Sequence, residues 1–266
     1  MTRGMLAAAV GLGLAGVVAE AGFANTSDRL DPRKVIEQSE QAIGRAIGNY
    51  KLTDSTGAQL SLRDYRGKPL VISLIYTACS SVCPPTTQHL IGAVNEASRV
   101  FGPDRFNVLT VGFDARNDTP ARLAHFASVQ GVKIKNWRLA SADPATIAAL
   151  LHDLGFSYVS VAGGFDHVTQ TTIVGSDGKV YRSVYGDDFP LQMFIEPLKD
   201  AIYGTSSSFS MSGILDRVKF ICTVYDPGAG RYRIDYGLAF GSIIAALSLL
   251  IFGGLIYREW FRTGHA

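Results

Sequence analysis

The chain has 266 residues, enough for one domain of about 150 residues with extensions, or for two small domains. Its 25 basic and 23 acidic residues give a formal net charge of +2, which offers no basic surface for nucleic acid. Its three cysteines are too few for a disulfide scaffold and point to redox or metal chemistry.

The first 24 residues are predicted to be an export signal. Arg3 is the only charge before Glu20, residues 5–18 are apolar, and small residues flank Glu20 as a cleavage site requires. An uncleaved anchor is the alternative, although this run is short for a hydrocarbon core of about 30 Å. Residues 25–49 are expected to be a leader, with a tethering amphipathic helix at residues 33–47.

Residues 50–203 are predicted to form one α/β domain. Residues 50–62 indicate a hairpin, and the apolar run at residues 70–76 is typical of a central strand covered on both faces. The elements that follow are helices at 84–100, 120–130, 144–154 and 190–203, and strands at 106–113, 137–140, 169–174 and 180–184. Parallel βαβ units followed by an antiparallel hairpin and a last helix predict a thioredoxin-like sandwich.

The C-terminal part is predicted to be a membrane anchor. Residues 204–236 are expected to be a linker and juxtamembrane segment, and residues 237–257 carry no charge. As a transmembrane helix this run would be about 31 Å long. With a cleaved signal, it predicts a main domain on the periplasmic side of the inner (cytoplasmic) membrane, contact with membrane lipid, and a cytoplasmic tail at residues 258–266.

Cys79 and Cys83 follow the predicted strand that ends at Tyr76, and ligands of α/β sheets gather beyond the carboxyl ends of strands. Pro84 suits the first turn of a helix, so the thiols are expected in a loop that closes onto a helix N-terminus, which favours the thiolate. Thioredoxin-type disulfide exchange uses Cys-x-x-Cys, whereas the wider spacing here favours a metal. Two thiolates suit Cu(I), and an added imidazole also allows Cu(II).

His167 is the predicted third ligand. It lies just before the strand at residues 169–174, where a thioredoxin-like fold turns a loop towards the cysteines, and the preceding Gly163 and Gly164 allow close approach. The remaining histidines are expected in surface or packing positions or in the tail: His89, His125, His152 and His265. Structural zinc and a buried disulfide are alternatives for the cysteine pair, but zinc needs a fourth ligand that is not found at zinc-finger spacing.

At these residues the chain resembles the Sco/SenC family, over roughly residues 43–203. The matching segments are residues 60–69, 76–84 and 111–119, and Asp166-His167. The resemblance implies that Cys79, Cys83 and His167 bind copper. The chain departs from many members in the residues between its cysteines, where an acidic residue is common, and in its C-terminal span.

The resemblance also implies a metallochaperone that delivers copper to the dinuclear copper centre of cytochrome c oxidase. Its partners would be the copper-centre subunit of a respiratory oxidase and other copper chaperones. Because some members act as thiol reductases, the alternative is an enzyme, a membrane-anchored thiol-disulfide oxidoreductase using Cys79 and Cys83. A peroxiredoxin-like peroxidase shares the fold, but the second cysteine so close by disfavours it.

The roles of three further residues stay open at this level. Asp114 and Asp118 match an acidic segment of the family, and they are expected either to contact a partner or the copper site, or to be solvated or capping residues. Cys222 lies outside the matching region, 15 residues before the predicted span. It is expected to be either a buried thiol or an accessory thiol near the membrane.

Overall fold

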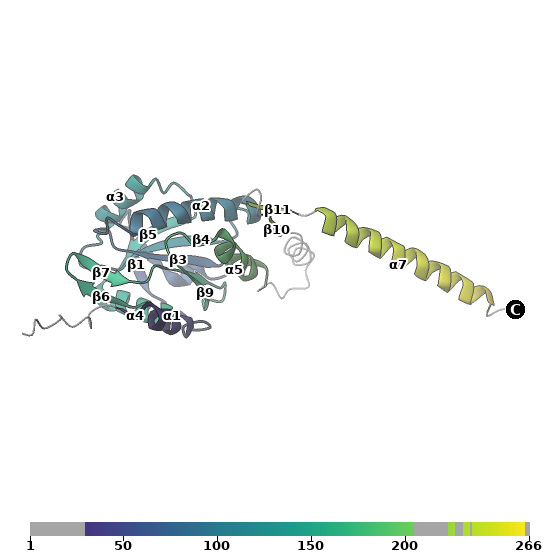
Figure 1. Cartoon of the computed structure of the whole chain (residues 1–266), viewed down its shortest axis with the longest axis horizontal. Helices are drawn as coiled ribbons and strands as arrows, with labels where there is room; N and C mark the ends of the chain where they lie inside the picture. The colour runs from purple at the N-terminus through teal and green to yellow at the C-terminus, as the bar shows by residue number, and fades with distance from the viewer. Residues whose placement is uncertain (1–29, 205–222, 227–230, 235, 264–266) are drawn as a thin grey trace, which may run out of the picture.

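The computed structural model describes residues 30–204, 223–226, 231–234 and 236–263 (Figure 1). The predicted signal at residues 1–24, and Cys222, lie outside the described residues. Within residues 30–204 the helices are α1 (Pro32–Glu40), η2 (Leu62–Tyr65, a 3-10 helix), α2 (Cys83–Phe101), α3 (Pro120–Gln130), α4 (Pro144–Leu154) and α5 (Leu191–Tyr203).

A seven-stranded sheet forms the centre of this part of the chain. Its spatial order is β2 (Gln59–Ser61), β1 (Lys51–Asp54), β5 (Trp137–Ser141), β4 (Asn107–Gly112), β3 (Leu70–Ile75), β8 (Gln170–Val174) and β9 (Val180–Tyr185). The three middle strands β5, β4 and β3 are parallel, and antiparallel strands complete the sheet on both sides. Every residue of β3 is buried, as expected for a strand with helices on both faces.

The helices begin and end at the residues that favour such boundaries. Thr119 and Asp143 accept hydrogen bonds from backbone N–H groups of α3 and α4, and a proline follows each cap. Gly155 ends α4 at φ 66°, where a Cβ would lie 2.8 Å from the Cα of Ser39. Helix α2 packs against α3 and α5, whereas α1 and α4 lie on the other side of the sheet (Figure 1). This arrangement confirms the predicted α/β sandwich.

The helix predicted at residues 33–47 is shorter in the structure. Helix α1 ends at Glu40, and the chain turns at Gly44, which has φ 84°, before residue 46 pairs with Lys179. The hydroxyl of Ser39 donates a hydrogen bond to Oε1 of Gln170 at 2.9 Å. Helix α1 therefore packs on the α/β domain.

A second departure from the sequence prediction is a hairpin formed by β6 (Tyr158–Val161) and β7 (Gly164–His167). It is an antiparallel pair that is separate from the seven-stranded sheet. His167, which was expected in a loop, is the last residue of β7. The sequence signal for this hairpin is the short alternation of Val159 and Val161 with Tyr158 and Ser160, followed by two glycines.

The C-terminal segment contains β10 (Thr223–Asp226), β11 (Arg231–Ile234) and α7 (Tyr236–Thr263). The two strands pair in antiparallel fashion inside the stretch expected to be a linker. Helix α7 includes residues 237–257, so the predicted helix is confirmed. Over the part of the chain that the structure describes, no helix meets the length and apolarity needed to cross a membrane.

Candidate functional site

The two cysteines of the described residues lie together where the chain leaves β3 and enters α2. Their exposed fractions are only 7% for Cys79 and 3% for Cys83, and both thiols are free. Cys83 is the first residue of α2, and its backbone N–H donates a hydrogen bond to Sγ of Cys79 at 3.3 Å. The partial positive charge of the helix N-terminus thus acts on the Cys79 sulfur.

The two thiols differ in acidity. Burial raises the pKa of Cys79, but hydrogen bonds from the backbone N–H groups of residues 81–83 and from the Cys83 side chain outweigh this effect and lower the pKa to about 7. Burial raises the pKa of the Cys83 thiol well above its ordinary value, and its hydrogen bond to Cys79 adds to the rise. Near neutral pH the pair therefore contains a partly ionised sulfur and a protonated one.

Asp118 holds the start of the cysteine loop (residues 76–83). Its carboxylate accepts hydrogen bonds from the backbone N–H of Thr77 at 2.8 Å, from the Thr77 hydroxyl at 2.7 Å and from the N–H of Asp114 at 2.9 Å. A Cβ at Gly112 would lie 2.6 Å from the Cβ of Asp118, so only glycine leaves room for this side chain. Asp118, which is 2% exposed, is a buried acceptor, whereas Asp114 is half-buried and bonds Asn117.

His167 is half-buried among aromatic rings at the end of the histidine hairpin (β6 and β7, residues 158–167). Its ring centroid lies 5.5 Å from those of Phe113 and Phe156 and 6.1 Å from that of Tyr76. Burial lowers the pKa of His167, so the imidazole is neutral at neutral pH. Neutral imidazole is the form that binds metals.

The structure places the three predicted ligands at one end of the sheet, but not close enough together to share a metal ion. Among the described residues, no group of three or more His, Cys, Asp or Glu side chains is close enough together to hold a metal ion. The donor types nevertheless fit copper, because two adjacent sulfurs and a neutral imidazole are ligands that it prefers. Tyr76, a residue that the sequence analysis did not single out, packs its ring against both Phe165 of the histidine hairpin and His167.

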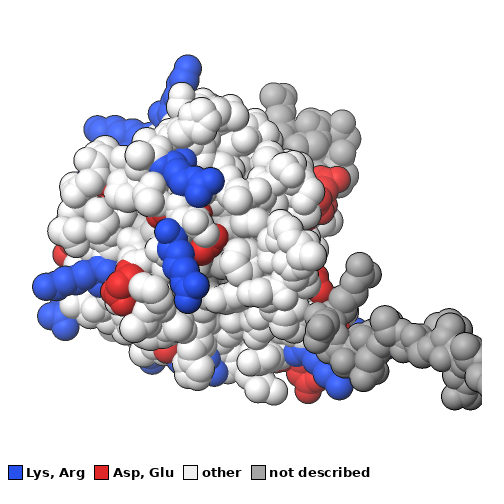
Figure 2. Space-filling model, turned by 90° about the vertical axis from the view of Figure 1, so that its left-hand side faces the viewer, with Lys and Arg blue, Asp and Glu red and all other residues white. Residues whose placement is uncertain are grey.

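The other described histidines lie in helices, as predicted. His89 contacts the carbonyl oxygen of Phe189 at 2.8 Å, and His152 is exposed beside Asp153. His125 on α3 lines a hollow of about 450 Å³ that also reaches Cys79. Figure 2 shows this end of the molecule, where charged side chains are separated by broad uncharged areas.

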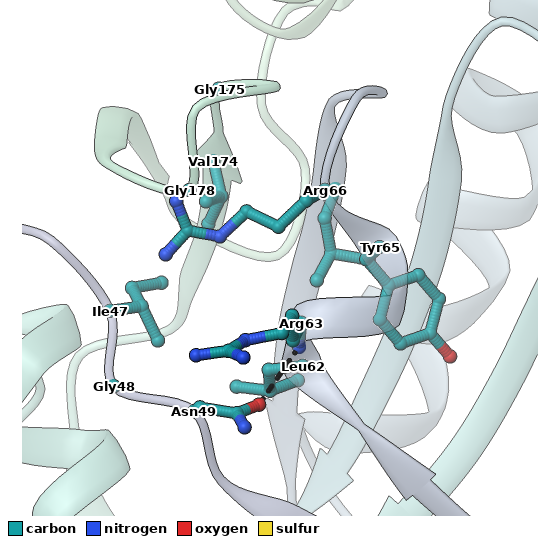
Figure 3. Close-up of a pocket in the computed structure, with 11 residues that line it drawn as sticks. Ile47, Gly48, Asn49, Leu62, Arg63, Tyr65, Arg66, Val174, Gly175 and Gly178 are labelled. Carbon is teal, nitrogen blue, oxygen red and sulfur yellow. Dashed lines mark hydrogen bonds between the residues drawn. The ribbon is translucent and has the colours of Figure 1, made fainter.

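A smaller cavity of about 140 Å³ lies away from this chemistry. It is lined by Leu70, the first residue of β3, and by Val174, which pairs with it, so it occupies the end of the sheet opposite the cysteines. Figure 3 shows the guanidinium groups of Arg63 and Arg66 directed into this cavity. None of the predicted ligands lines it.

The fold and the paired thiols define a thioredoxin-like protein with a cysteine site at the carboxyl end of its central strand. Residues 38–202 match the model of the SCO1/SenC family, and the chain belongs to that family. The SCO1 protein homolog of Bacillus subtilis (strain 168) is 24% identical over 172 residues, which span 62% of this chain and 87% of that protein.

Two solved structures share the fold. BsSco, described as a member of the Sco family of cytochrome c oxidase assembly proteins with a disulfide switch, matches with a TM-score of 0.54 and 22% identity, over 59% of this chain and 94% of its own. Arabidopsis thaliana ScoI with copper bound matches with a TM-score of 0.52 and 14% identity, over 60% of this chain and 99% of its own.

Proposed function

We propose that this protein binds copper through Cys79, Cys83 and His167 and delivers it for assembly of the dinuclear copper centre of cytochrome c oxidase. The observation that carries the proposal is the pair of adjacent free thiols at the N-terminus of α2, with His167 at the same end of the sheet. Membership of the SCO1/SenC family and a copper-bound relative of the same fold support it.

Each of the three residues has its own role in copper binding. Cys79, with its pKa of about 7, provides a thiolate at neutral pH, and it is the sulfur that lines the hollow beside α3. Cys83 gives up its proton when the metal arrives, and His167 adds the imidazole. A site of three ligands leaves a position open, so the thiolates and imidazoles of an oxidase subunit can replace them one at a time without releasing free copper.

Copper analysis of the purified full chain tests the proposal. We expect one copper ion per chain, lost on Cys79→Ser or Cys83→Ser and kept on Cys222→Ser. The last variant is the matched control, because it removes the remaining thiol in the same way. Equal copper content in the wild-type chain and both site variants would contradict the proposal.

A thiol-disulfide oxidoreductase is the second candidate, and the unequal acidity of the two thiols favours it. The Cys79 thiolate would attack a partner disulfide, releasing one partner thiolate and forming a mixed disulfide. Cys83 would then lose its proton and attack the Cys79 sulfur, which breaks the mixed disulfide and releases the second partner thiolate. The partner gains two electrons, and this protein keeps a Cys79–Cys83 disulfide.

His167→Ala separates the two candidates, because copper binding needs the imidazole and disulfide exchange does not. In cells at limiting copper, we expect His167→Ala to lower the copper content of the oxidase, as Cys79→Ser does. Full oxidase copper in the His167→Ala cells, together with loss in the Cys79→Ser cells, would make thiol exchange the function.

We further propose that α7 anchors the protein in the inner (cytoplasmic) membrane, with residues 25–232 on the periplasmic side. The support is the row of large apolar side chains on α7, including Phe240, Leu250 and Phe252, which are each more than half exposed. Reporter fusions test this topology. A cytoplasmic reporter should be inactive when inserted at Ser206 and active after Ala266, and the reverse pattern would overturn the proposal.

A further inference from the structure

The cavity at the end of the sheet opposite the cysteines is built from three separate parts of the chain. They are the segment before β1, helix η2 with the start of β3, and the turn between β8 and β9. The backbone N–H of Ile47 donates a hydrogen bond to the carbonyl oxygen of Gly178 at 3.0 Å. The N–H of Gly67 donates one to the carbonyl oxygen of Ser176 at 2.9 Å. The walls of the cavity are therefore fixed by the fold itself.

The lining of this cavity combines apolar and cationic side chains. The apolar ones belong to the buried core of the domain: Ile47, Leu62, Leu70 and Val174. The cationic ones are Arg63 and Arg66, whose guanidinium groups point into the cavity (Figure 3). Among the described residues, no acidic side chain lines it. Its interior is therefore electropositive over an apolar surface.

The two arginines are held in different ways. The Arg66 guanidinium donates a hydrogen bond to the carbonyl oxygen of Asp177, and it lies against Gly178, where a side chain would clash with it. Arg63 is held through its backbone, because its N–H donates a hydrogen bond to Oδ1 of Asn49 at 3.1 Å. Within the described part of the chain, the Arg63 guanidinium has no hydrogen-bond or ion-pair partner. Its N–H donors are therefore free to bind a ligand.

The carboxylates next to these arginines in the sequence are paired elsewhere. Asp64 accepts a hydrogen bond from the backbone N–H of Ser61 at 3.1 Å. Asp177 accepts one from the backbone N–H of Lys179, also at 3.1 Å, and its carboxylate lies 3.9 Å from the ammonium group of Lys179. Neither carboxylate forms an ion pair with the guanidinium groups in the cavity.

We propose that this cavity is a binding site for a phosphate group. Its volume of about 140 Å³ admits a compact group and excludes a folded partner. A guanidinium binds two oxygens of an anion through parallel N–H···O bonds. One arginine would therefore satisfy a carboxylate, whereas Arg63 and Arg66 together match the larger number of oxygens on a phosphate group. The group can belong to free phosphate or to a phospholipid headgroup.

The position of the cavity supports the lipid as the source. A neighbouring hollow at the same end of the domain is lined by Gly67, Ser176 and Ile202, and Ile202 belongs to the last turn of α5. The chain therefore leaves the α/β domain at the end that carries the two arginines. With α7 as the proposed membrane anchor, a headgroup bound here would turn the cysteine end away from the membrane surface.

Titration calorimetry of the full chain in an uncharged, phosphate-free detergent tests the site. The probes are inorganic phosphate, acetate as the carboxylate control, and dihexanoyl phosphatidylglycerol, a short-chain lipid, below its micellar concentration. We expect Arg63→Gln to weaken phosphate binding about tenfold, the effect of losing hydrogen bonds to a charged group. Arg116→Gln is the matched control, because Arg116 is exposed outside the cavity and the variant loses the same charge. It should change the affinity by no more than about twofold.

The lipid probe decides the source of the phosphate group. Tighter binding of the lipid than of inorganic phosphate, lost in Arg63→Gln, assigns the site to a headgroup, and equal or weaker binding assigns it to free phosphate. Arg63→Lys keeps the charge but loses the two-oxygen geometry, so we expect an intermediate affinity.

Three results would overturn the proposal: no binding of either phosphate probe, equal losses in Arg63→Gln and Arg116→Gln, or acetate binding as tight as that of phosphate. Copper content should be the same in all of these chains, because the cavity contains none of the proposed copper ligands. The result is therefore independent of the proposed copper function.

Discussion

The cysteine loop and the histidine hairpin provide the two halves of the candidate site, and they are held in different ways. The loop is fixed at one end by the hydrogen bonds of Asp118 to Thr77 and at the other by the first turn of α2. The hairpin pairs only with itself, its residues are exposed or half-buried, and its contacts with the site are mainly ring packing.

Under the proposed function, the sulfurs would be in place before the metal, and the imidazole would have to move to reach it. A strand end and a helix start that belong to the main core cannot move without disturbing that core. A separate hairpin can shift by breaking a few contacts. In the proposed copper carrier, a ligand on a separate element would give the site a way to open and release the metal.

The largest expected effect is a difference in copper retention between variants of the cysteine loop and variants of the histidine hairpin. Cys79→Ala should weaken retention more than about 100-fold, because it removes a ligand rather than an outer-shell contact, which is typically worth about 10–100-fold. His167→Ala should weaken retention less, and more strongly for Cu(II) than for Cu(I). Competition with a chelator of known affinity measures both variants, and equal losses for the two oxidation states would contradict the division of roles.

Asp118→Asn should loosen the cysteine loop. The amide cannot accept from all three donors that the carboxylate serves, so we expect a loss of about 1–3 kcal/mol in the free energy of unfolding. Urea denaturation measures the change. Asp114→Asn is the control and should change stability by no more than about 0.5 kcal/mol, because the Asp114 side chain is half-buried. Equal effects would mean that Asp118 does not hold the loop.

The pH dependence of thiol alkylation should distinguish the Cys79 thiol from the Cys83 thiol. Because the pKa of Cys79 is lowered to about 7, its thiolate fraction falls as the pH drops below that value and levels off above it. The alkylation rate with iodoacetamide should therefore fall about tenfold per pH unit below the pKa. Cys83, whose pKa is raised by burial, should stay unreactive in the same range. Peptide mass mapping identifies the labelled residue, and preferential labelling of Cys83 would reverse the assignment.

The smallest expected effect is that of His125→Ala. His125 lines the hollow beside Cys79 but belongs to neither half of the site, so copper content should be unchanged. Transfer of copper to an oxidase subunit should slow if the partner docks over this hollow. A loss of bound copper in this variant would show that His125, and not His167, completes the ligand set.

Much of the fold could be predicted because its signals are local. The apolar run at β3, the prolines and caps of α3 and α4, and the glycine at the end of α4 each act within a few residues. The position of Cys79 and Cys83 follows from the same kind of signal, because the strand end and the proline after Cys83 locate them. The histidine hairpin has only short alternating strands, and the loop predicted there shows how weak that signal is.

The sequence by itself determined the layered α/β architecture, the cysteine pair at the start of α2 and the choice of His167 as a candidate ligand. Only the tertiary structure decided that Asp118 is a buried acceptor for Thr77, since residues 41 positions apart meet there. It likewise decided that the ring of Tyr76 packs against both Phe165 and His167 of the hairpin. Local propensities act over a few residues, whereas these contacts depend on how separate strand ends and turns pack at one edge of the sheet.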